Sequence, residues 1–129
     1  MIVDYIHRPD QHEGLVLSSF CLQTGEPDSV FRELLRGGMV VKVDQTQGKR
    51  SDGLPICPGW AARMPGGPLV YAYVKHELRD FPIIPRLLQV LGLDNGEEIP
   101  VMFHTRQIRA IGRAWNIPLV PWLAPEVRN

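Results

Sequence analysis

The sequence predicts an α+β fold, a single domain over residues 1–129 in which a mixed β-sheet is flanked by helices. The stretch 69–74 is apolar on both faces and rich in β-branched and aromatic residues, as in a central strand that is covered on both sides. The stretch 84–91 then carries apolar residues at i, i+3, i+4 and i+7, the pattern of a helix lying on a sheet. A short polar link, 75–79, joins the two, so they form half of a strand-helix-strand unit with an anion site expected at the helix start.

The composition is that of a folded protein without a strong net electrostatic field. Apolar residues make up 44% and charged residues 22% of the 129 positions, so one domain can bury a core. Fourteen basic residues balance fourteen acidic ones, which argues against nucleic-acid binding through net charge. No apolar run approaches membrane-spanning length, and residues 1–4 do not begin a signal peptide. Cys21 and Cys57 show no paired motif, which favours a reducing compartment such as the cytosol.

The N-terminal third predicts one strand and two helices. Apolar and polar residues alternate over 2–6, which indicates the first strand. Asp10 and Glu13 form a capping-box pattern, which predicts a helix from about Gln11 to Leu22. A second, amphipathic helix is expected to end at the two glycines 37–38.

The middle of the chain predicts strands around a polar loop. Residues 39–43 read as the second strand. Residues 44–53 are polar, and within them 48–53 read as a mobile loop or hairpin tip. Residues 56–64 are a strand candidate, placed at an edge or a bulge by their prolines. The tight turn predicted at 65–68 would join this strand to 69–74 as an antiparallel hairpin.

The C-terminal third completes the strand-helix-strand unit. Residues 99–103 predict a strand that pairs in parallel with 69–74 through a right-handed crossover. Thr105 can cap a last amphipathic helix, and residues 117–123 predict a final short strand interrupted by prolines.

This order of elements resembles the GCN5-related N-acetyltransferase (GNAT) superfamily. The phrases GWAA at 59–62, LVYAYVK at 69–75 and RDFPII at 79–84, with the leucine pair that follows at 87–88, are similar to acetyltransferase-like proteins of bacteriophages. In those proteins a tyrosine-rich strand precedes an arginine-led loop and a helix with two leucines. The phrase VLSSF at 16–20 also resembles a VxSSW phrase of the same proteins.

The resemblance implies that acetyl-coenzyme A (acetyl-CoA) binds between the central strand and its parallel neighbour. Amides at the helix start would hold the pyrophosphate, and the end of the strand would pair with the pantetheine arm. A backbone N–H near Val74 would meet the oxyanion, and an acceptor amine would attack the thioester without a covalent intermediate. The implied cofactor-binding residues are Tyr73, Val74, Lys75, Arg79, Asp80, Phe81, Pro82, Ile83 and Ile84.

Two departures from the family pattern affect the expected site. Pro82 and Ile84 stand where the family has small residues, and they remove an N–H donor and add bulk at the expected phosphate position. The segment 104–116 has no tyrosine to protonate the leaving thiolate. His104 or Thr105 is therefore the candidate acid, and the candidate base is Glu77 or its neighbour His76.

Several of these residues have simpler explanations. Tyr71 and Tyr73 also fit ordinary sheet packing, and Arg79 fits either a phosphate contact or an exposed side chain. The arginines at 106, 109 and 113 form a basic stripe that is typical of a solvated helix face and would otherwise hold a 3′-phosphate or nucleic acid. No short-spaced ligand set predicts a metal, and Cys57 lies between prolines and not at a helix start that would activate it.

The sequence therefore favours a phage or prophage acyl-CoA-dependent N-acyltransferase that acts on an amine of unknown identity. The alternative is a non-catalytic phage protein of the same fold that binds a virion or host partner. A nucleic-acid-modifying or anti-defence factor is a third reading, disfavoured by the balanced charge. The expected location is the host cytoplasm or the virion, with no membrane association.

Overall fold

The computed structural model describes residues 2–4, 9–44, 59–79 and 81–123, and side chains from residue 14 onward except that of Glu77. The elements in chain order are β1 (Ile2–Asp4), α1 (Pro9–Thr24), α2 (Asp28–Arg36), β2 (Val40–Asp44), β3 (Gly59–Arg63), β4 (Leu69–Val74), the short 3₁₀ helix η2 (His76–Leu78), α3 (Ile83–Val90), β5 (Ile99–Val101), α4 (Arg106–Trp115) and β6 (Leu119–Pro121).

The strands form one mixed sheet in the order β1-β2-β3-β4-β5-β6. The first four strands are antiparallel neighbours, whereas β5 pairs in parallel with both β4 and β6. The predicted α+β class, the β3–β4 hairpin and the parallel pairing of β4 with β5 are therefore confirmed. Within the described part of the chain, no helix is long and apolar enough to cross a membrane.

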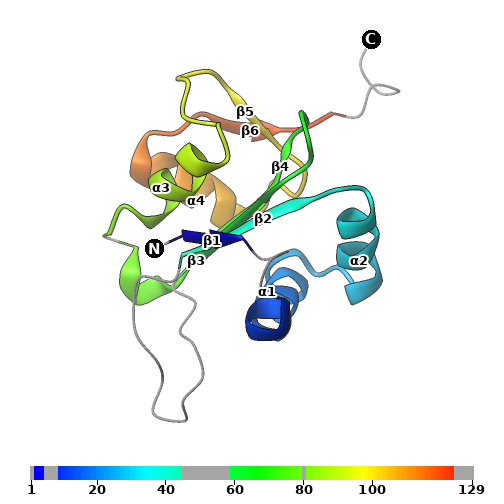
Figure 1. Cartoon of the computed structure of the whole chain (residues 1–129). Helices are drawn as coiled ribbons and strands as arrows, with labels where there is room; N and C mark the ends of the chain where they lie inside the picture. The colour runs from blue at the N-terminus through cyan, green and yellow to red at the C-terminus, as the bar shows by residue number, and fades with distance from the viewer. Residues whose placement is uncertain (1, 5–8, 45–58, 80, 124–129) are drawn as a thin grey trace.

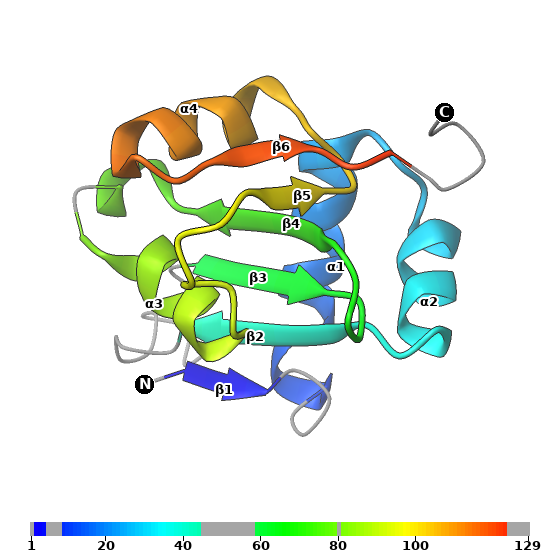
Figure 2. The same ribbon diagram turned by 90° about the horizontal axis from the view of Figure 1, so that it is seen from above.

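The helices cover both faces of the sheet. Figures 1 and 2 place α3 on one face and α1 with α2 on the other. The apolar side of α3 is buried against β2, β3 and β4, as its predicted spacing requires. Gly59 in β3 allows this close approach, because a Cβ there would lie 2.9 Å from Ile83 Cγ2 and 2.7 Å from the carbonyl oxygen of Tyr73.

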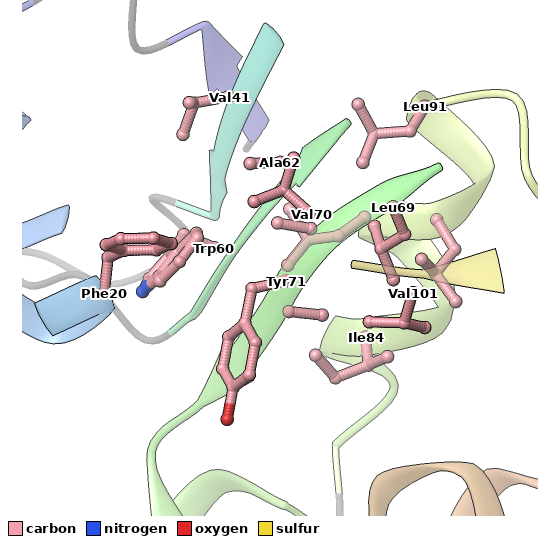
Figure 3. Close-up of a cluster of buried hydrophobic side chains, with 14 of the residues drawn as sticks. Phe20, Val41, Trp60, Ala62, Leu69, Val70, Tyr71, Ile84, Leu91 and Val101 are labelled. Carbon is pink, nitrogen blue, oxygen red and sulfur yellow. The ribbon is translucent and has the colours of Figure 1, made fainter. Parts of the chain in front are cut away.

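An aromatic cluster joins α1 to the sheet. The Phe20 ring of α1 lies 5.1 Å from Phe31 and 5.5 Å from Phe103, and the Trp60 and Tyr71 rings lie 6.0 Å apart. Trp60 Nε1 donates a hydrogen bond of 2.8 Å to Ser19 Oγ, which satisfies the polar atom of this buried indole. Figure 3 shows Trp60 beside Phe20, and it shows the Tyr71 hydroxyl directed away from the apolar cluster.

Most predicted boundaries lie within two residues of the observed ones. Thr105 caps α4 as predicted, since its Oγ1 accepts from Ile108 N. Strand β5 ends at Val101 and not at Phe103, because the chain turns away into α4. Strand β6 is likewise shorter than the predicted 117–123. The predicted residues 5–6 and 56–58 lie outside the described residues.

Asp44 was expected to begin the polar stretch 44–53, beyond the end of the second strand, and this prediction is wrong for that residue. It is the last residue of β2 and is fully buried, and its Oδ2 lies 2.6 Å from Arg86 Nη2 of α3. The arginine helps to neutralise this buried carboxylate, so the polarity of Asp44 alone did not indicate its environment. The rest of the polar stretch, 45–53, with the loop predicted at 48–53, lies outside the described residues.

Candidate functional site

The strands β4 and β5 meet at one point and then diverge. Among the described residues their register consists of the single pair Leu69 and Val101. Met102 N donates to the Leu69 carbonyl oxygen at 2.8 Å and Phe103 N to that of Val70 at 3.4 Å, after which the chain leaves the sheet for α4. In Figure 1, β5 is inclined steeply to β4. The last residues of β4 are therefore separated from β5.

A hydrogen bond between Tyr71 and Thr105 connects β4 to the start of α4 across this divergence. The hydroxyl oxygens of the two residues lie 2.9 Å apart, and Tyr71 is fully buried. Burial raises the pKa of the Tyr71 hydroxyl above 10, and the bond to Thr105 and the charge of Arg79 offset part of this rise. Tyr71 is therefore neutral at physiological pH and can donate a proton or a hydrogen bond.

Arg79 lies beside the same divergence. Its Nη2 donates to Gln107 Oε1 of α4 at 3.0 Å. Its Nε is buried and has no hydrogen-bond partner in the described part of the protein. A buried N–H without an acceptor costs free energy, so this guanidinium is suited to an anionic partner.

The described backbone at the start of α3 offers few free amides for a phosphate. The amides of Leu78, Arg79, Phe81, Ile83 and Arg86 donate to carbonyl oxygens of the same segment, over 2.7 to 3.3 Å. Pro82 and Pro85 carry no N–H. Phosphate contacts in this segment would therefore come mainly from side chains.

The side chain of Ile84 does not occupy the expected phosphate position. Ile84 and Ile83 are only 1% and 3% exposed and belong to the core, where Figure 3 shows Ile84 near Val101. Phe81 and Pro82 are exposed instead. The steric obstruction expected from Ile84 is thus not observed, whereas the missing N–H of Pro82 remains.

The two candidate catalytic residues are placed differently. His104 follows β5, and its Nε2 lies 3.2 Å from the carbonyl oxygen of Leu119. A carbonyl oxygen only accepts, so Nε2 carries the proton and Nδ1 is the nitrogen left for chemistry. The side chain of Glu77 and the whole of Asp80 lie outside the described residues. His76 at the start of η2 is exposed.

A cavity that the sequence did not predict lies between α1 and the ends of β3 and β4. Its volume is about 210 Å³, and it is mostly apolar. We call it the α1 cavity; its lining includes Leu15, Ser19, Leu22, Trp60, Tyr73 and Lys75. Its lining residues lie as far apart in the sequence as Leu15 and Lys75, so no local motif could reveal the cavity. The available signal was that α1 carries leucines, Leu15 and Leu22, on a side away from its core residues Val16 and Phe20.

The remaining candidate groups show no assembled site. The arginines of α4 at 106, 109 and 113 are exposed, as on a solvated helix face. In the described part of the chain, no three His, Cys, Asp or Glu side chains gather as metal ligands would. Cys57 lies outside the described residues.

Comparison with known proteins found no match. No family model matches the sequence, and neither a curated protein nor a solved structure matches the chain. The resemblance to the GNAT superfamily therefore stays a prediction.

Proposed function

We propose that this protein is a GNAT-like N-acyltransferase that binds acetyl-CoA where β4 and β5 diverge. The observation that carries the proposal is the single residue pair between these strands, Leu69 with Val101. A ladder that stops after one pair leaves room along the end of β4 for an extended group, which can pair with strand backbone as a peptide does. The order of elements from β1 to β6 supports the same proposal.

Arg79 is the proposed contact for the cofactor phosphates. The amides at the start of α3 are largely engaged with their own segment, so a side chain must supply most of the positive charge. Arg79 offers a buried Nε that lacks a partner among the described residues, and guanidinium matches phosphate geometry well.

In the proposed reaction a neutral amine attacks the thioester carbonyl carbon, and the carbon–sulfur bond breaks. The backbone N–H near Val74 would stabilise the oxyanion. His104 and Glu77 are the proposed proton donor and acceptor. The Nε2 contact of His104 persists in both charge states of the ring, so the histidine keeps its orientation when Nδ1 gains or loses a proton.

A second function, a non-catalytic protein that binds a virion or host partner, is favoured by one observation. The engaged amides and the two prolines at the start of α3 leave few backbone donors for phosphate. The same fold would then serve only as a binding surface.

Calorimetric titration with acetyl-CoA separates the two functions. The enzyme proposal predicts micromolar affinity for the wild-type protein and a loss of roughly tenfold or more, about 1.4 kcal/mol, for Arg79→Glu. Arg36→Glu is the control, because it reverses a charge on the exposed end of α2 and should leave affinity unchanged. No heat of binding for the wild-type protein would contradict the enzyme proposal and favour the binding protein.

A further inference from the structure

We propose that the α1 cavity is the acceptor pocket and that it takes a small amino acid-like amine, with an apolar side group and a carboxylate. This inference rests on the proposed acyl transfer. It adds the chemical class of the acceptor, which the fold alone does not give.

The size and lining of the α1 cavity select for one apolar group. About 210 Å³ is less than the roughly 300–1,000 Å³ of pockets for drug-sized ligands, so it suits a single ring or branched chain. Trp60 and Tyr73 form one wall and Leu15 and Leu22 the other. Because Trp60 Nε1 is already bonded to Ser19, the indole presents apolar surface to the cavity.

Exposure of Leu22 points to an occupant of this cavity. Its side chain is 81% exposed at the rim, although Val16 and Phe20 of the same helix are fully buried in the core. Covering an exposed leucine removes apolar surface from water, which stabilises a complex. An apolar ligand group would therefore gain affinity from a surface that the protein alone leaves in water.

The charge in the lining selects for an anion. Lys75 is a basic residue of the lining, and Ser18 and Gln23 add neutral polar groups. None of the described side chains that line the cavity is acidic. A carboxylate is attracted by this lining, whereas an ammonium group without a carboxylate is repelled by Lys75.

The position of the cavity suits an acceptor. Tyr73 and Lys75, at the end of β4, belong both to its lining and to the segment proposed for the pantetheine arm. An amine held there would lie beside the thioester. Its nitrogen bonds to the carbonyl carbon, the sulfur leaves with the electron pair of the broken bond, and the proton lost by nitrogen balances the proton gained by sulfur. The products are an N-acylated amino acid and free coenzyme A.

Release of the coenzyme A thiol from acetyl-CoA, with L-phenylalanine as the acceptor, tests the inference. L-alanine lacks the ring and phenethylamine lacks the carboxylate, so each should react with a kcat/KM at least roughly tenfold lower, which corresponds to about 1.4 kcal/mol. Lys75→Met should bring phenylalanine and phenethylamine to similar rates, a change in ratio that a general structural defect would not produce. Ser18→Trp should fill the cavity, abolish transfer and retain the acetyl-CoA affinity of the wild-type protein.

The outcomes separate this inference from the proposed function. Acetyl-CoA binding without transfer to phenylalanine, or with equal rates for the three amines, would overturn the acceptor pocket and leave the cofactor site standing. Absence of acetyl-CoA binding would overturn the proposed function and the acceptor role with it.

Discussion

Tyr71 shows how a single side chain connects the folding of this protein to its candidate site. Its ring packs near Trp60, while its hydroxyl reaches Thr105 at the start of α4. The hydroxyl thereby holds together the two chain segments that diverge after Leu69 and Val101. A tyrosine on β4 was read from the sequence as a packing residue, and its link to α4 depends on a residue 34 positions away.

Replacement of Tyr71 by phenylalanine should reduce stability by about 1 kcal/mol at neutral pH, because the hydrogen bond between Tyr71 and Thr105 is lost. Burial raises the pKa of Tyr71 in the folded state, so above about pH 10 the unfolded chain releases a proton that the folded protein retains. Wild-type stability should therefore fall as pH rises past 10, and Tyr71→Phe should lack that part of the fall. Urea unfolding between pH 7 and 11 measures it.

Tyr73→Phe is the matched control, since it removes a hydroxyl from the same strand and keeps the Tyr71 ionisation. It should keep the part of the alkaline loss that Tyr71 contributes. Parallel curves for Tyr71→Phe and the wild-type protein would contradict the assigned environment of Tyr71.

The ion pair of Asp44 with Arg86 joins strand β2 to helix α3. The Asp44 carboxylate is fully buried, whereas the Arg86 side chain is partly exposed. Arg86→Met should destabilise the protein by about 1–3 kcal/mol, because it leaves a buried carboxylate without this cation while part of the arginine side chain was already solvated. Arg32→Met, which breaks an exposed pair with Asp28, should cost less than about 1 kcal/mol. Chemical denaturation of both variants measures the difference, and equal costs would contradict the buried role of Arg86.

The packing of α3 on β3 requires a glycine at position 59. Gly59→Ala should destabilise by about 1–3 kcal/mol, since the new Cβ would meet Ile83 and the backbone of Tyr73 at less than 3.0 Å. Gly14→Ala has nothing within 4 Å and lies inside α1, so it should stabilise by about 0.5–1 kcal/mol. Thermal unfolding of the two variants gives shifts of opposite sign, and a stabilised Gly59→Ala would refute the close contact.

At the scale of the whole molecule, the sequence predicted what depends on local pattern. Strand and helix periodicities gave the element order and the mixed sheet, and the Thr105 cap followed from residue type and position. Asp44 was misplaced because its partner lies 42 residues away, and the α1 cavity was missed because three separate segments form it. The cofactor and the reaction came from the resemblance alone and stand as proposals.

Amide NMR mapping with acetyl-CoA tests where the cofactor binds. In a titration of the ¹⁵N-labelled protein, we expect the largest shift changes at 73–75 and at the amides of Arg79, Phe81 and Ile83. Amides of α2, on the other side of the sheet, should stay unchanged. Changes confined to another surface, or no change at saturating acetyl-CoA, would contradict a cofactor site at the end of β4.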